Sequence, residues 1–180
     1  IILLAPQWQG ERGRKRRAEF FATLFGHQDL AIYELAYLEM SRAPYGMILR
    51  LSRSVSQTQI KRMWNRQQYI EWRSLAILML AHCGSAKDKQ YISESFRSAE
   101  RFGLTTNLAA LAAASIEIEG SAAVSFIGNR YLANPDRKDE ELAEVFKAVS
   151  LHGNEGRTKL RDQIICTYGT LIDVHPEMSH

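Results

Sequence analysis

Hydrophobic residues recur along most of the chain at the three- and four-residue spacing of one face of an α-helix. Ala18, Phe21, Ala22 and Phe25 form the first such stripe, and Gly26 follows them as a helix stop. Similar stripes, separated by glycine, proline or serine, continue to about residue 173 and indicate about ten helices. The helices with the clearest bounds are expected over residues 28–42, 69–81 and 86–101.

Two segments are expected to lie at the centre of the fold. Residues 75–81 are continuously hydrophobic, so their helix should be buried nearly all round. The next-but-one helix carries Leu104, Leu108 and Leu111, and its AALAAAS sequence is rich in small residues that let neighbouring backbones approach closely. Only four prolines in 180 residues also favour helix over sheet. The predicted fold class is all-α.

A longer pattern recurs around three glycines, Gly84, Gly120 and Gly153, which are 36 and 33 residues apart. Four residues before each glycine stands an aliphatic residue, and the residue after it is Ser or Asn, which suits a cap or turn. A period of this length corresponds to one helix–turn–helix unit, which buries its apolar face against a neighbouring unit. We therefore expect an α-solenoid of about five stacked helical hairpins.

These glycine-punctuated hairpins, together with YELAYLEMSRAPY at residues 33–45, resemble the HEAT/armadillo type of α-solenoid over about residues 14–173. The resemblance implies a scaffold or binding surface, usually for protein and occasionally for nucleic acid. We expect residues 1–12 to be an extended N-terminal segment from an upstream region, 13–173 the repeat domain and 174–180 a C-terminal tail. Because the first residue is Ile1 rather than methionine, we also expect the chain to be a piece of a longer protein.

Charge is unevenly distributed along the chain. Residues 1–75 carry a net charge of +6 and residues 76–180 a net charge of −3. The segment GERGRKRRAEF at residues 10–20 holds five of the basic residues. A second set of basic residues in the same half of the chain is interleaved with two tryptophans, Trp64 and Trp72. Such a pattern is typical of a solvated helix flank, or of a surface that contacts phosphates. The candidate binding residues are Arg14, Lys15, Arg16, Arg17, Arg62, Trp64, Arg66 and Trp72.

The adjacent His82 and Cys83 are the residues most suggestive of chemistry. Neighbours on a helix point about 100° apart, so His82 is badly placed to deprotonate Cys83, and we expect a structural corner. Glu117 and Glu119 diverge for the same reason and do not form an acid–base pair. Two cysteines give neither a disulfide framework nor a zinc spacing. We therefore expect no catalytic residue, metal, cofactor or small-molecule substrate.

The expected function is that of a non-catalytic protein-interaction or scaffolding module of a larger protein, with a protein as its partner. The alternative is a nucleic-acid-binding HEAT-like domain that uses the basic N-terminal half. No apolar run approaches the roughly 20 residues of a membrane-spanning helix. The sequence leaves the compartment and the oligomeric state open.

Overall fold

The part of the chain that the structure describes is mostly helical and contains no strand. This structure is a computed structural model, and it describes residues 10–65, 70 and 72–176. The predictions of an all-α class and of about ten helices are confirmed. The α-helices are α1 (Gly10–Leu24), α2 (Leu30–Ser41), α3 (Tyr45–Leu51), α4 (Gln57–Asn65), α5 (Arg73–Cys83), α6 (Ala86–Phe102), α7 (Leu108–Glu119), α8 (Ser121–Ile127), α9 (Asp139–Asn154) and α10 (Arg161–Val174).

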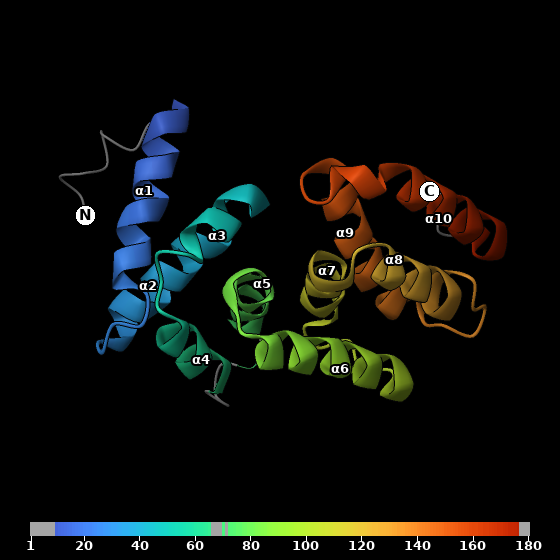
Figure 1. The fold of residues 1–180 in the computed structure, drawn as a ribbon, viewed down its shortest axis with the longest axis horizontal. Helices are drawn as coiled ribbons and strands as arrows, with labels where there is room; N and C mark the ends of the chain where they lie inside the picture. The colour runs from blue at the N-terminus through green and yellow to red at the C-terminus, as the bar shows by residue number, and fades with distance from the viewer. Residues whose placement is uncertain (1–9, 66–69, 71, 177–180) are drawn as a thin grey trace.

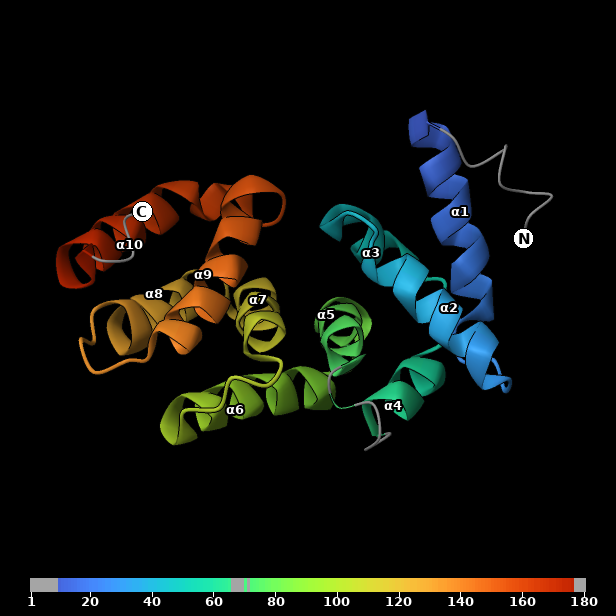
Figure 2. The same ribbon diagram turned by 180° about the vertical axis from the view of Figure 1, so that it is seen from behind.

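The helices are arranged in space in roughly the order in which the chain visits them. Helices α1 to α4 lie at one end of the molecule, α5 and α7 lie near its middle, and α8 to α10 lie at the other end (Figure 1). Helix α7 packs against α5 on one side and against α9 on the other. Helix α6 crosses along one edge of α5 and α7, as the view from behind also shows (Figure 2). Helix α7 is therefore the central helix.

The two segments expected at the centre of the fold are found there. Residues 75–77 and 79–81 of α5 are buried, so this short helix has almost no exposed face. Residues 110–116 of α7 are all buried as well, and five of them are alanine or serine. Small side chains allow helix axes to approach closely. The small side chains of α7 explain how a helix can pack closely against it on each of two sides.

Local signals fix the helix ends. Ser85 and Asp88 form a capping box at the start of α6, in which each side chain bonds the backbone N–H of the other residue. Gly103 ends α6 in the left-handed conformation, with φ of 62°, which glycine adopts at little cost. Of the glycines singled out in the sequence, Gly84 and Gly120 directly follow helix ends, and Gly26 lies two residues after the end of α1.

Three predicted boundaries are wrong. Helix α1 begins at Gly10 rather than Gly13, because the charged residues that look like an exposed leader are good helix formers. Gly153 lies inside the last turn of α9, since its backbone stays helical up to Asn154. Leu104 precedes α7 and is 51% exposed, because a turn through Asn107 separates it from the helix. Residues 1–9 and 177–180 lie outside the described residues, and α10 extends to Val174.

The recurrent glycines mark corresponding ends of the three helices in the central row. Gly84 follows α5, Gly120 follows α7, and Gly153 lies in the last turn of α9. The aliphatic residue four positions before each glycine is buried in all three cases. The segments that follow differ, since α6 has 17 residues whereas α8 has 7 and continues as a π-helix over Gly128–Leu132. The pattern therefore identified equivalent helix ends but not identical hairpins.

Candidate functional site

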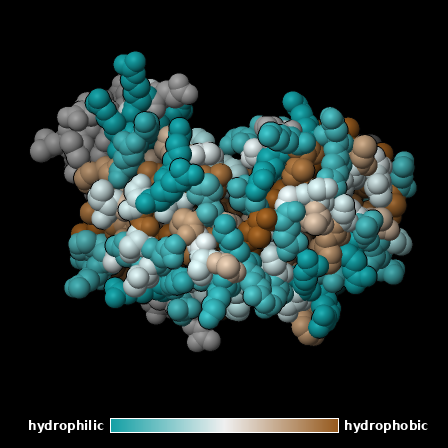
Figure 3. Space-filling view, in the orientation of Figure 1, coloured by the Kyte–Doolittle hydropathy of each residue, from teal (hydrophilic) through white to brown (hydrophobic). Residues whose placement is uncertain are grey.

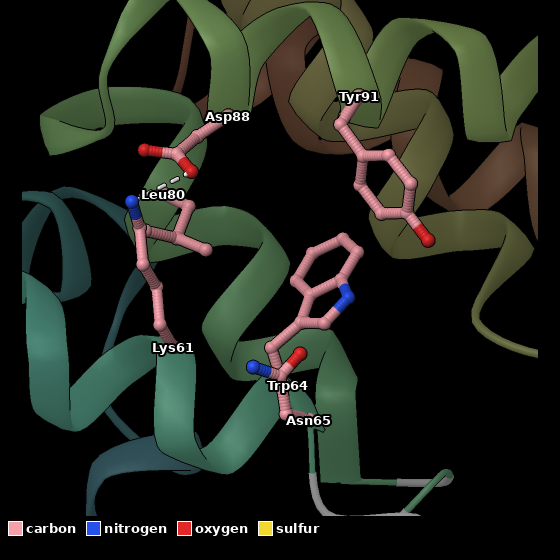
Figure 4. Close-up of a pocket in the computed structure, with 6 residues that line it drawn as sticks. All are labelled: Lys61, Trp64, Asn65, Leu80, Asp88 and Tyr91. Atoms are coloured by element: carbon pink, nitrogen blue, oxygen red, sulfur yellow. Dashed lines mark ion pairs between the residues drawn. The ribbon is translucent and has the colours of Figure 1, made fainter.

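Trp64 of α4 and Tyr91 of α6 approach each other at the surface. Their ring centroids are 5.5 Å apart and the ring planes lie at 64°, an edge-to-face arrangement. Figure 4 shows both side chains beside one hollow, with Lys61 and Asp88 on its other side. Ile60 and Met63 bury the inner face of α4, so Lys61 and Trp64, three residues apart, share its flank.

The two aromatic side chains lie where two hollows of the surface meet. One hollow has a volume of about 240 Å³ and extends toward Leu80 and the start of α6. The other has a volume of about 460 Å³ and continues along α6 to Leu104 and Leu111. We call the two hollows together the α4–α6 groove, and the lining residues that matter most are Lys61, Trp64, Ile70, Asp88, Tyr91 and Leu104.

Several apolar side chains in the walls of the groove are exposed, among polar and charged ones. Tyr91 is 56% exposed, Leu104 is 51% exposed and Ile70 is 39% exposed. Isolated apolar side chains are common on protein surfaces, but several of them gathered in one hollow are typical of an interaction site. The α4–α6 groove therefore has the composition of a binding surface.

One wall of the groove is held by Asn107. Its side-chain amide donates to the backbone oxygen of Ile70 at 2.9 Å, and its oxygen accepts from the Ser74 hydroxyl at 2.8 Å. Asn107 adopts a left-handed backbone conformation, with φ of 59°, which is uncommon for residues other than glycine. These bonds fix the position of the Ile70 backbone relative to α7.

Two charged side chains at one end of the groove pair with each other. Lys61 Nζ lies 2.9 Å from Asp88 Oδ1. Burial alone would raise the pKa of Asp88, but hydrogen bonds from Ser85 and the contact with Lys61 hold it below its usual range. Asp88 is therefore an ionised, bonded carboxylate. The groove offers apolar contact and fixed charge, which suit binding.

The other candidate residues of this region have separate positions. Trp72 stacks on Tyr37, with ring centroids 4.6 Å apart and planes at 6°, and it packs against the hydrophobic core. Its position is that of a core aromatic residue rather than part of the groove. Arg62 is exposed on α4. Arg66 lies outside the described residues.

The basic segment of α1 lies elsewhere. Arg14, Lys15 and Arg16 are exposed, and hydrophilic side chains stand out over α1 in Figure 3. Arg17 instead contacts Glu39 of α2 at 2.6 Å. The N-terminal turns of α1 lie at the end of that helix away from α4 in both Figure 1 and Figure 2. The structure therefore does not bring the basic residues of α1 together with Arg62 and Trp64.

His82 and Cys83 have different neighbours. His82 Nε2 accepts from Arg53 Nε at 3.3 Å, and burial and Arg53 both lower the pKa of His82. Burial raises the pKa of the Cys83 thiol. A nucleophilic cysteine needs a lowered pKa and a base within hydrogen-bond reach. The geometry agrees with the structural corner expected from the sequence.

A polar cluster that the sequence did not predict is centred on Glu117 of α7. Its Oε2 accepts from the Tyr45 hydroxyl at 3.4 Å and lies 3.5 Å from Arg157 Nε, and its Oε1 lies 4.0 Å from His82 Nδ1. Burial and the nearby Glu117 raise the pKa of Tyr45. The Glu117 cluster, which consists of these four residues, links α3, α5, α7 and the segment after α9. Each of the other three residues contacts Glu117, as expected for a structural tie.

Glu119, two residues further along α7, bonds a different partner. Its Oε2 lies 3.0 Å from Arg97 of α6. The prediction that the two carboxylates diverge is therefore confirmed.

The Glu117 cluster could not be predicted from the sequence, because Tyr45 and Glu117 are 72 positions apart in the chain and no local spacing connects them.

The described residues contain no group of three His, Cys, Asp or Glu side chains that could hold a metal ion. None of the helices within the described ranges has the length and apolar character needed to span a bilayer. Compared with models of known protein families, with curated proteins and with solved structures, the chain matches none.

Proposed function

We propose that the chain is a non-catalytic protein-interaction module of the HEAT-like α-solenoid type. Its binding site is the α4–α6 groove, and its ligand is a short apolar segment of a partner protein. The observation that carries this proposal is the gathering of Trp64, Ile70, Tyr91 and Leu104 around one continuous groove. Aromatic residues at the centre of a hollow are the usual anchors of protein interfaces.

The charge of the groove supports an apolar ligand. Lys61 and Asp88 neutralise each other at one end, while Arg73 and Glu94 contribute one charge of each sign to the other hollow. A groove with no net charge gains little electrostatic free energy by binding a charged ligand. The two hollows on either side of Trp64 suit a segment with two apolar anchors, one for each hollow.

The packing of the central helices supports the repeat type. Helices α5, α7 and α9 pack in sequence, and recurrent glycines stand at or near their C-terminal ends. Helical repeats stacked in this way present extended surfaces for other proteins. In this arrangement the groove lies where α4 meets α6, on the outside of the central row.

Selection of random dodecapeptides displayed on phage tests the proposal, with the whole chain as bait. We expect enrichment of peptides with two aliphatic or aromatic positions. For a selected synthetic peptide, the Kd should rise at least tenfold in Tyr91→Ala and in Trp64→Ala. The control is Ile172→Ala, which removes an apolar side chain of similar exposure, 54%, from α10.

Tyr91→Ala is the more informative variant because Tyr91 is largely exposed and its loss should leave the fold intact. Unchanged circular dichroism would establish that the two groove variants are folded. The proposal is wrong if no peptide is enriched. It is equally wrong if selected peptides bind Tyr91→Ala and Ile172→Ala with the same affinity as the original chain.

A further inference from the structure

A second cavity lies between α1 and the turn that joins α2 to α3. Its volume is about 180 Å³. Three arginines, Arg14, Arg17 and Arg42, contribute to its walls, and Glu39 is the acidic residue among the described lining residues. The lining side chains therefore carry two more positive than negative charges.

Glu39 holds two of the three arginines in place. Its Oε1 lies 2.6 Å from Arg17 Nη2 and 3.4 Å from Arg42 Nη1, and its side chain is only 8% exposed. A guanidinium group has five N–H donors in a rigid plane, so the single contact of Arg42 with Glu39 leaves most donors of Arg42 available to other acceptors. The side chain of Arg42 is 71% exposed and accessible to a ligand.

The rest of the cavity lining is apolar. Ala18, Pro44 and Met47 lie among the arginines, and Ala18 is only 4% exposed. An aliphatic carboxylate has methylene groups for such a surface and an anionic end for the arginines. A phosphodiester backbone is polar around each phosphate and carries a sugar on both sides. The apolar lining and the small volume therefore favour a carboxylate.

We propose that this cavity binds a Glu or Asp side chain presented by a partner protein. The site is separate from the α4–α6 groove, and its ligand is negatively charged rather than apolar. Binding there does not depend on the groove, so either site can fail its test while the other passes. The basic excess of the N-terminal half of the chain would then serve to attract an acidic protein segment.

Fluorescence anisotropy with a fluorescein-labelled hexaglutamate peptide tests this site. At low salt we expect binding by the whole chain and at least a tenfold rise in Kd for Arg14→Gln and for Arg42→Gln. The matched control is Arg16→Gln, which removes the same charge from an exposed position of α1 that does not line the cavity. Its Kd should rise less than twofold.

Arg42→Lys separates a shaped site from diffuse attraction, because it keeps the charge but loses the planar donors. We expect at least a threefold weakening, whereas diffuse attraction predicts no change. Arg14 and Arg42 are exposed, and circular dichroism should confirm that their variants are folded.

Four results would overturn the proposal. Arg42→Lys could leave the Kd unchanged. The peptide could fail to bind at low salt, or Arg16→Gln could weaken binding as much as Arg14→Gln does. Inorganic phosphate or a twelve-nucleotide single-stranded DNA could compete more strongly than unlabelled hexaglutamate, which would assign the cavity to phosphate instead.

Discussion

Replacing Glu117 with alanine should lower the free energy of unfolding by about 2 kcal/mol. Glu117 contacts Tyr45 of α3, His82 of α5 and Arg157 in the segment after α9. Its side chain is 15% exposed, so water can replace its contacts only in part. The variant removes the central acceptor of the Glu117 cluster, so the donors of the cluster lose that acceptor.

The expected magnitude has two parts. Tyr45 is 4% exposed, and its hydroxyl would lose the Glu117 acceptor, which costs about 1–3 kcal/mol for a buried polar group. The side chain of Arg157 is 46% exposed, so loss of its ion pair contributes only about 0–1 kcal/mol after screening by water. A loss of about 2 kcal/mol lowers the Tm of a chain of this size by roughly 4–8 °C.

Urea denaturation followed by circular dichroism measures the loss, and Glu119→Ala is the matched control. Glu119 lies in the same last turn of α7, but it pairs with Arg97, whose side chain is 51% exposed, so its loss should cost less than about 1 kcal/mol. Combining Glu117→Ala with Tyr45→Phe should show a coupling energy of about 1 kcal/mol. Equal losses for the two glutamates, or zero coupling, would refute this account of the cluster.

Two further predictions concern stability. His152 is buried, its Nδ1 accepts the N–H of Arg157 at 3.1 Å, and burial lowers its pKa, so the folded chain favours neutral imidazole. The free energy of unfolding that neutral His152 contributes should be fully present above about pH 6.5 and decline below that pH. Urea denaturation between about pH 7.5 and 5.5 should show this decline. His152→Gln should make the decline smaller. An added Cβ at Gly84 would lie 2.4 Å from the oxygen of Leu80, so Gly84→Ala should cost about 1–3 kcal/mol in thermal melts. Gly46→Ala in α3 meets nothing within 4 Å and should instead gain about 0.5–1 kcal/mol; a neutral Gly84→Ala would contradict this reasoning.

Much of the fold could be predicted because its signals are local. Helical spacing of apolar residues and the glycines that end helices act within one or two turns, and both are visible in the sequence. The error at Gly153 arose where a local signal competes with packing. Gly153 looks like Gly84 and Gly120 in sequence, yet its helix continues for another residue. A Cβ at Gly153 would lie 3.5 Å from Ile164, so tertiary packing rather than a turn surrounds this glycine.

The candidate site was predictable only in part, because its residues are brought together by contacts that are distant in sequence. Trp64 was singled out because it lies among the basic residues of the second set, and it does line the groove. Trp72 was chosen on the same grounds, but stacking on Tyr37 places it against the core. Tyr91 is not among the residues chosen from the sequence, because its exposure depends on the way α6 faces α4. The contact between Trp64 and Tyr91 can be seen only in the folded structure, where α4 and α6 are packed together.

The backbone of Asn107 connects the groove to the central helix. It is the residue other than glycine with positive φ among the described residues, and such strain persists where surrounding contacts outweigh it. The contacts here are its bonds to Ile70 and Ser74, which fix the start of α5 and one wall of the groove to α7. A wall held before the ligand arrives costs less conformational entropy on binding. The bonds of Asn107 to Ile70 and Ser74 thus give this turn a structural role, and a wall fixed in this way suits the ligand-binding role proposed for the groove.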